Sequence, residues 1–196
     1  MHLPPQGTGW IEVICGSMFS GKTEELIKRL RRADYARQIV RIYKPAIDRR
    51  YDESEIVSHS EQRITSRVIS RAEEILDLTG EAVQVVGIDE AQFFEMELLD
   101  VCRELASRGI RVIVAGLEQD YQAQPFPVMA ALMVEAEYVT KSLAICVICG
   151  NPALRNQRTN QKGGQILLGG AEAYEARCRR CFRPHSDDAS LFGNDS

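Results

Sequence analysis

The sequence predicts an α/β fold in which a parallel sheet is flanked by helices and a small cysteine-bearing module follows. Three observations lead to this prediction. Short apolar runs alternate with helical patterns through the first two thirds of the chain, a glycine-rich motif joins the first run to the first helical pattern, and two cysteine pairs lie near the C-terminus. Nearly continuous apolar strands that are separated by helices are typical of parallel sheets covered on both faces.

Five apolar runs are the candidate strands, because they are rich in β-branched residues and mostly too short for helices. They are residues 10–15, 39–43, 67–69, 83–88 and 111–115. Two helical patterns lie among them. In the first, over residues 23–33, one face carries Leu26, Ile27, Leu30 and Ala33. In the second, which Gly109 ends, one face carries Leu98, Leu99, Cys102 and Leu105.

The length and composition allow one hydrophobic core of full size with a small additional domain. The chain has 196 residues, of which 44% are hydrophobic, and two full domains would need a longer chain. The character of the sequence changes near residue 142, where the cysteine pairs begin. We therefore expect a main domain over residues 1–141 and a small domain over residues 142–183. Residues 184–196 offer little that could be buried, so we expect a disordered tail.

The charge and the hydropathy disfavour two classes of partner. With 24 basic and 28 acidic residues the formal net charge is −4, so no basic field favours binding to nucleic acid. No apolar run approaches the roughly 20 residues that cross a bilayer. Residues 1–9 lack the basic and apolar pattern of a signal peptide. We therefore expect a cytoplasmic protein with neither a membrane nor a polynucleotide as its partner.

The glycine-rich motif matches the GxxxxGK[ST] pattern of a phosphate-binding P-loop. It consists of Gly16, Ser17, Met18, Phe19, Ser20, Gly21, Lys22 and Thr23. The glycines let successive amide hydrogens face the phosphates of ATP, and the N-terminus of the following helix adds positive charge. Lys22 would reach the β- and γ-phosphates, and Thr23 would bind Mg²⁺. The flanking strand and helix disfavour the alternative, a glycine-rich turn with a solvated lysine.

An acidic pair, Asp89 and Glu90, ends the fourth apolar run as in a Walker B motif. Because Mg²⁺ is held at the carboxyl end of a buried strand beside the P-loop, Asp89 is the candidate metal ligand. Glu90 is a candidate general base. It could activate water, as in an ATPase, or deprotonate an acceptor hydroxyl, as in a kinase, and the pair alone does not decide between them. Without the P-loop, a solvated turn or a helix cap would be the favoured interpretation.

Four of the six cysteines form two CxxC pairs, Cys146 with Cys149 and Cys178 with Cys181. In a reducing compartment this spacing favours a metal over disulfides. Four thiolates suit tetrahedral Zn²⁺ and leave no position for water, which predicts a structural zinc site that fastens both ends of a long loop. Zinc ribbons also bind nucleic acid, so that alternative stays open.

Together these motifs resemble the cellular-type (type II) thymidine kinases. The resemblance is carried by Met-Phe-Ser inside the P-loop, by Ile88-Asp89-Glu90-Ala91-Gln92-Phe93-Phe94, by Asp120-Tyr121 with Pro125-Phe126, and by Gly169-Gly170-Ala171-Glu172-Ala173-Tyr174 between the cysteine pairs. It runs from about Gly9 to Phe182. The order and the spacing of these pieces make the combination specific.

The resemblance implies a kinase that transfers the γ-phosphoryl group of ATP to the 5′-hydroxyl of thymidine, which gives dTMP and ADP for DNA synthesis. Glu90 is similar to the family's catalytic base. Arg50, in the stretch Asp48-Arg49-Arg50-Tyr51, would stabilise the transferring phosphoryl group, whereas the residues alone would suggest a surface arginine. The segment between the cysteine pairs resembles the family's lasso, which closes over the base and excludes water. The resemblance also implies a homotetramer.

The resemblance further implies a nucleoside pocket lined by Met18, Leu117, Tyr121, Phe126 and Tyr174. The ring of Tyr121 stands where the family usually has Phe, and either ring can stack on a pyrimidine. From the residues alone, Met18 and Leu117 would be ordinary core positions.

The sequence departs from the family pattern at three places. Ser60-Glu61 follow His59 where the family often has Asp-Gly, so we assign no role to His59. Glu118 stands where Asp is common. Leu154-Arg155-Asn156 replaces a small, threonine-rich run, a change that bears on base selectivity.

Two other functions compete with the kinase. A P-loop ATPase would use Glu90 to activate water and would release phosphate without any nucleoside. A noncatalytic protein would bind nucleic acid through the zinc module and sense nucleotide through the P-loop, an interpretation that the net charge of −4 disfavours.

Overall fold

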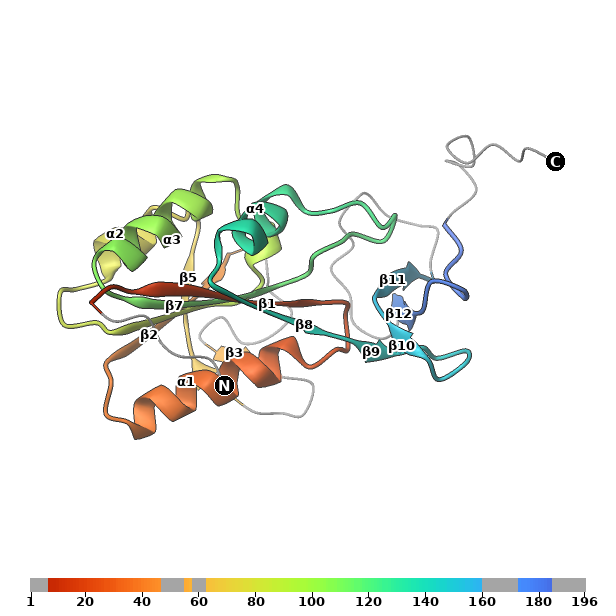
Figure 1. Cartoon of the computed structure of the whole chain (residues 1–196), viewed down its shortest axis with the longest axis horizontal. Helices are drawn as coiled ribbons and strands as arrows, with labels where there is room; N and C mark the ends of the chain where they lie inside the picture. Colours follow the sequence, from red (N-terminus) through yellow and green to blue (C-terminus); the bar gives the residue numbers. More distant parts are fainter. Residues whose placement is uncertain (1–6, 47–54, 58–62, 160–172, 185–196) are drawn as a thin grey trace.

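A six-stranded parallel sheet lies at the centre of the fold, with strand order β5-β2-β6-β7-β1-β8 (Figure 1). The computed structural model describes residues 7–46, 55–57, 63–159 and 173–184. The strands of this sheet are β1 (Trp10–Gly16), β2 (Val40–Pro45), β5 (Arg67–Ile69), β6 (Val85–Ile88), β7 (Arg111–Gly116) and β8 (Tyr138–Ser142). The predicted α/β fold with a parallel sheet is confirmed.

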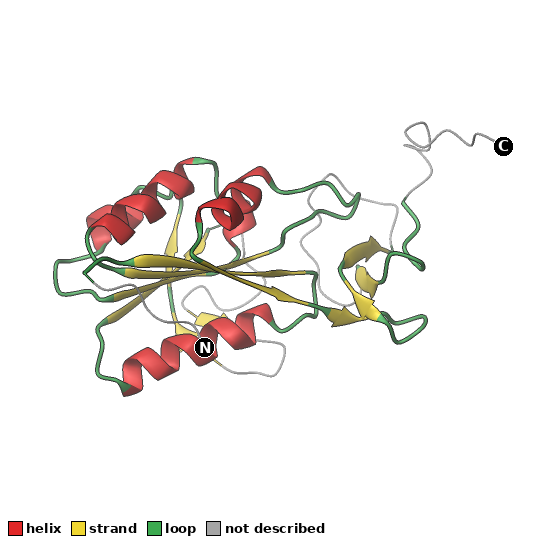
Figure 2. Ribbon diagram, viewed as in Figure 1, coloured by secondary structure: helices red, strands yellow, loops and turns green. Residues whose placement is uncertain are grey.

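Helices cover both faces of this sheet (Figure 2). One face carries α1 (Lys22–Tyr35), and the other carries α2 (Glu74–Leu78), α3 (Glu97–Ser107) and α4 (Pro127–Glu135). A short 3-10 helix, η1 (Ala91–Phe93), follows β6. The two predicted helices are present as α1 and α3.

The strands send alternate side chains into two separate cores. On β1, Val13 and Cys15 belong to the core under α3 and α4, whereas Ile14 belongs to the core under α1. On β7, Val114 belongs to the core under α3 and α4, and Ile113 belongs to the core under α1. Because both faces of these strands are apolar, the strands appear in the sequence as continuous apolar runs.

The edge strand β8 and the helices α2 and α4 were not predicted. In β8, half-buried and exposed residues alternate, and the strand lies at the edge of the sheet, so its sequence lacks an apolar run. α4 is apolar on nearly all sides, so no helical period stands out. The predicted fourth strand begins at Val85 instead of Val83, because the amide of Val83 bonds to the carbonyl of Gly80 in a turn.

Three two-stranded antiparallel sheets lie outside the main sheet. They pair β3 (Glu55–Val57) with β4 (Arg63–Thr65), β9 (Ala144–Ile145) with β10 (Pro152–Ala153), and β11 (Arg155–Arg158) with β12 (Tyr174–Arg177). The last two pairs form the cysteine-bearing module, which the chain enters from β8 through Leu143. Among the helices of the described residues, none has both the length and the apolar character to span a membrane.

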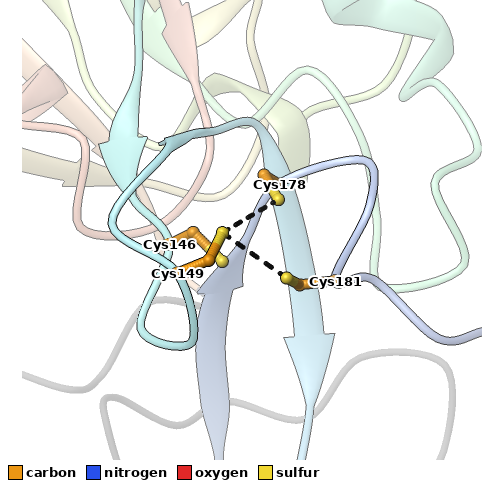
Figure 3. A group of neighbouring side chains, drawn as sticks. All are labelled: Cys146, Cys149, Cys178 and Cys181. Carbon is orange, nitrogen blue, oxygen red and sulfur yellow. Dashed lines mark hydrogen bonds between the residues drawn. The ribbon is translucent and has the colours of Figure 1, made fainter.

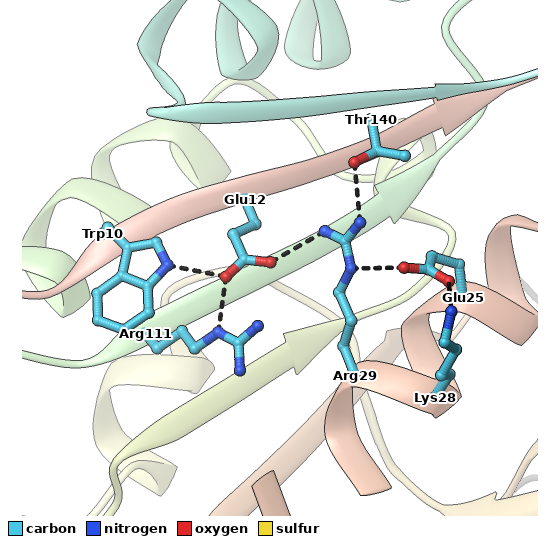
Figure 4. Close-up of polar contacts among 7 residues, drawn as sticks. All are labelled: Trp10, Glu12, Glu25, Lys28, Arg29, Arg111 and Thr140. Atoms are coloured by element: carbon cyan, nitrogen blue, oxygen red, sulfur yellow. Dashed lines mark hydrogen bonds and ion pairs between the residues drawn. The ribbon is translucent and has the colours of Figure 1, made fainter. Parts of the chain in front are cut away.

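Glu12 is a buried carboxylate at the centre of a polar network under α1 (Figure 4). It accepts hydrogen bonds from Trp10 Nε1 at 2.8 Å, Arg111 Nε at 2.7 Å and Arg29 Nη1 at 2.9 Å. Desolvation raises the pKa of Glu12, but the hydrogen bonds and charges of its partners outweigh that effect and hold the pKa below its usual value. The carboxylate therefore links α1 to β1 and β7.

Candidate active site

The P-loop connects β1 to α1, as predicted. Three of its residues have positive φ angles, which are 148° at Gly16, 64° at Phe19 and 81° at Gly21. At Gly16 a Cβ atom would lie only 2.2 Å from the carbonyl oxygen of Ser142 at the end of β8, so this position requires glycine. The side chain of Lys22 folds back, and its Nζ donates to the carbonyl of Ser17 at 2.7 Å. This turned backbone at a helix N-terminus is the shape that a phosphate-binding loop requires.

Thr23 and Asp89 meet at the carboxyl end of the sheet. Thr23 lies in the first turn of α1, and its Oγ1 donates to Asp89 Oδ2 at 3.3 Å. Asp89 is buried and follows β6 directly. A hydroxyl and a carboxylate at this edge of a parallel sheet are oxygen donors of the kind that Mg²⁺ prefers.

Glu90 turns the chain between β6 and η1 with a left-handed backbone, φ 51° and ψ 40°. This conformation is uncommon for a residue other than glycine and tends to occur at functional sites. One carboxylate oxygen of Glu90 accepts a hydrogen bond from Gln92 Nε2 at 2.5 Å. The Oε1 atom of Gln92 accepts the amide hydrogen of Leu117 at 3.0 Å. Gln92 therefore links Glu90 to the end of β7.

Charged groups gather around Lys22. Desolvation lowers the pKa of Lys22, while the charges of Glu90, Asp89 and Glu118 act in the opposite direction. Glu118 follows β7, is buried, and has its Oε1 2.9 Å from the Nζ of Lys141. Three carboxylates give this edge of the sheet a negative field that a bound divalent cation would offset.

The four predicted metal ligands, Cys146, Cys149, Cys178 and Cys181, come together in the cysteine-bearing module (Figure 3). Their Sγ atoms all lie within 4.8 Å of one another, and the Sγ of Cys149 is 3.6 Å from that of Cys178 and 3.5 Å from that of Cys181. Thiolates around a tetrahedral zinc ion are about 3.8 Å apart, so this spacing fits the ion. Desolvation raises the pKa of Cys146, but nearby backbone hydrogen bonds outweigh it and lower the pKa to about 6, whereas the hydrogen bond with Cys149 raises the pKa of Cys181 to about 12.

The cysteine-bearing module packs directly on the P-loop. The side chain of Phe19 packs against the small apolar cluster of the module. Ser17 Oγ donates to the carbonyl of Ala153 at 3.2 Å, and the amide of Met18 donates to Asn156 Oδ1 at 2.8 Å. The P-loop therefore has the helix α1 on one side and the module on another.

The predicted nucleoside-pocket residues lie around the P-loop, the segment after β7 and the module. Tyr121 lies in the loop between β7 and α4, and the Arg158 guanidinium lies over its ring, 5.1 Å from the centroid. Tyr174 pairs with Arg158 in the register of β12 and β11. Phe126 packs against the main core, and Met18 and Leu117 are half-buried. The structure thus brings Tyr121 and Tyr174 to the same arginine.

Some predicted functional positions lie outside the described residues. They are Arg50 and residues 160–172 of the predicted lasso, and His59, to which no role was assigned, lies outside the described residues as well.

Comparison with known proteins identifies the family. A family model described as thymidine kinase matches residues 9–182. The chain belongs to the thymidine kinase family. The thymidine kinase of Rhodothermus sp. (strain ITI 518) is 58% identical over 176 residues, which cover 90% of this chain and 82% of that protein. The thymidine kinase of Bdellovibrio bacteriovorus is 54% identical over 183 residues, 93% of this chain and 90% of that protein. The thymidine kinase of Bacteroides fragilis (strain YCH46) is 54% identical over 175 residues, 89% of this chain and 87% of that protein.

Membership of the thymidine kinase family confirms the resemblance and makes the chain a kinase of a family that uses ATP. Sequence reasoning assigned no role to Gln92 or Asn156. Both side chains are uncharged, and only their burial and their hydrogen bonds single them out. A polar residue two positions after Glu90 in an otherwise apolar string was the one signal that could have indicated Gln92.

Proposed function

We propose that the chain is an ATP-dependent thymidine kinase, a transferase that moves the γ-phosphoryl group of ATP to the 5′-hydroxyl of thymidine and releases dTMP and ADP. Family membership supports the acceptor and the donor. The observation that carries the proposal is the meeting of the P-loop with Asp89 and Glu90, where Thr23 contacts Asp89 and the left-handed turn holds Glu90 next to it.

In this proposal residues 16–23 bind the nucleotide. The backbone amides of the loop donate to phosphate oxygens, and Lys22 exchanges its bond to the Ser17 carbonyl for the β- and γ-phosphates. Thr23 and Asp89 supply oxygen ligands to Mg²⁺. The ion, when bound, offsets the charge of the phosphates.

Glu90 is the proposed catalytic base. Its carboxylate takes the proton of the 5′-hydroxyl while the hydroxyl oxygen attacks the γ-phosphorus and the bond to the ADP oxygen breaks. The hydrogen bond from Gln92 orients the Glu90 carboxylate that is proposed to receive the proton. Arg50 is proposed to stabilise the charge that spreads over the phosphoryl oxygens.

Met18, Leu117, Tyr121, Phe126 and Tyr174 are the proposed lining of the nucleoside pocket. Their distribution around the P-loop, the segment after β7 and the strand β12 supports this assignment. The lasso is proposed to close over the base and to exclude water, which suppresses ATP hydrolysis.

We propose the same domain division as the sequence predicts. Residues 1–141 form the ATP-binding domain and residues 142–183 the zinc-binding lasso domain, while the predicted tail lies outside the described residues from residue 185 on. The end of β8 at Ser142 supports this boundary. The cluster of four cysteines, with its sulfur spacing, supports a structural Zn²⁺ whose closed coordination leaves no place for water.

We infer a homotetramer from the family resemblance and a cytoplasmic location from the reduced thiols that a zinc site requires. The formal net charge of −4 supports a small nucleoside over a polynucleotide as the partner.

A panel of nucleosides incubated with γ-radiolabelled ATP tests the proposed function. We expect the label to appear in the monophosphate of thymidine, with little phosphate released when no nucleoside is present. Release of phosphate at the same rate with and without nucleoside would support the ATPase alternative and overturn the proposal.

A further inference from the structure

One buried amide connects the P-loop to the segment that follows β7. The side chain of Asn156 lies on β11 and is 3% exposed. Its Oδ1 accepts the backbone amide of Met18 at 2.8 Å, and its Nδ2 donates to the backbone carbonyl of Gln119 at 2.9 Å. Asn156 therefore holds two loops that approach it from different strands of the main sheet.

The two hydrogen bonds require an amide in one orientation. A backbone N–H needs an acceptor and a backbone carbonyl needs a donor, and the reversed amide of Asn156 would set donor against donor and acceptor against acceptor. Loss of the amide would leave both half-buried backbone groups without these partners, which is costly wherever water cannot replace them. A smaller or apolar side chain supplies neither bond.

Other contacts tie β11 to the segment after β7. Burial alternates along β11, so Asn156 and Arg158 share the buried face of the strand. Arg158 lies over the ring of Tyr121, and Arg155 donates to the side chain of Gln119. The module therefore contacts the segment after β7 at several points, and Asn156 adds a contact to the P-loop.

We propose that Asn156 is a positioning residue that couples the nucleotide and nucleoside sites. The inference rests on the proposed function, because it takes the loop at Met18 as the phosphate site and the segment at Gln119 as the border of the nucleoside pocket. A ligand that orders one loop restricts Asn156, which in turn restricts the other loop. Each ligand therefore tightens the binding of the other by the same factor.

Calorimetric titration of the full chain with Mg·ADP, with and without saturating thymidine, measures this coupling without turnover. In the wild type we expect ADP to bind at least about fivefold more tightly when thymidine is present. In Asn156→Ala we expect the ratio of the two dissociation constants to fall below about twofold, because both bonds to the loops are lost.

Two further variants separate coupling from folding. Asn156→Asp keeps the size of the side chain and its bond to Met18 but loses the donor to Gln119. The added charge of the aspartate affects ADP binding equally with and without thymidine, so it cancels in the ratio of the two dissociation constants. That ratio should also fall below the wild-type value. Gln157→Ala is the matched control, because within the described residues this neighbouring amide hydrogen-bonds to neither loop but to the Arg183 amide at 2.8 Å and the Arg158 carbonyl at 3.4 Å. Its ratio should equal that of the wild type.

A wild-type ratio in both Asn156 variants would overturn the inference, as would a wild-type protein that binds both ligands without coupling. A wild-type protein that binds ADP but not thymidine would instead overturn the proposed function. The two failures are therefore distinguishable.

Discussion

Gln92 donates to the carboxylate of Glu90 at 2.5 Å while its own oxygen accepts the amide of Leu117. The proposed base is thus fastened to the end of a central strand. The space for this amide depends on Gly116, where a Cβ atom would lie 2.9 Å from Gln92 Oε1 and 2.7 Å from Met129 Sδ. The orientation of Glu90 is therefore set by the packed sheet.

Replacing Glu90 with Gln should lower phosphoryl transfer to thymidine by about 10²- to 10⁴-fold, because the amide cannot take the proton of the hydroxyl. ATP binding should stay nearly intact, since Glu90 is not among the proposed phosphate ligands. Single-turnover assays and ATP titrations measure the two effects. Glu95→Gln, at an exposed position nearby, is the control and should behave as the wild type. Unchanged turnover in Glu90→Gln would refute the assignment of the base.

Cys149→Ser should lower the zinc content per chain and raise the KM for the nucleoside, because three thiolates hold the ion less firmly and the lasso loses one anchored end. Metal analysis by mass spectrometry and steady-state kinetics measure both effects. Cys102→Ala is the matched control, because Cys102 is buried in the core of the main sheet. It should lose some stability but no zinc. Wild-type zinc content and KM in Cys149→Ser would contradict the proposed zinc site.

Glu12→Gln should lower the free energy of unfolding at neutral pH by about 2 to 4 kcal/mol, because it removes the buried carboxylate that Arg29 and Arg111 share. Urea denaturation measures the change. Glu25→Gln removes a more exposed carboxylate that also pairs with Arg29, and it should cost less than about 1 kcal/mol. An equal cost in the two variants would show that burial of Glu12 adds nothing.

The contribution of Glu12 should also depend on pH. Its pKa in the folded protein lies below the usual 4.5, so the unfolded chain takes up the proton first as the pH falls. The stabilisation is therefore complete above about pH 4.5 and is lost as the pH falls through the lower pKa of the folded state. The stability difference between the wild type and Glu12→Gln should stay level above that pH and shrink below it. A difference that grows on acidification would contradict this sign.

Gly87→Ala should destabilise the protein by about 1 to 3 kcal/mol through overpacking. The new Cβ atom would lie 2.8 Å from Leu30 Cδ1 at the contact between β6 and α1. Thermal unfolding measures the effect. Gly80→Ala is the control, since no atom lies within 4 Å of the added Cβ, and it should change stability by less than about 1 kcal/mol. Equal melting temperatures for the two variants would rule out the predicted clash.

The sequence predicted the central strands because β1, β6 and β7 are covered on both faces and are therefore mostly apolar. It did not predict β8 or α4. An edge strand with exposed alternate residues and a helix without a polar face both lack the period on which the prediction depends.

The candidate site also has one part that the sequence predicted and one part that it did not. The P-loop, the acidic pair and the cysteine pairs are contiguous in sequence, so local patterns indicated them. Asn156 and Met18 are separated by 138 positions, and their contact arises only when the cysteine-bearing module packs on the P-loop. No local pattern carries that information, and the same holds for the link from Gln92 to Leu117.

Gly16 lies where the P-loop touches the last carbonyl of β8, with 2.2 Å between that oxygen and any added Cβ. A methyl group at residue 16 would push the P-loop away from β8, the strand that leads into the cysteine-bearing module. A saturation library at residue 16 should therefore return only glycine under selection for thymidine phosphorylation, because any side chain at this position would clash with the Ser142 carbonyl.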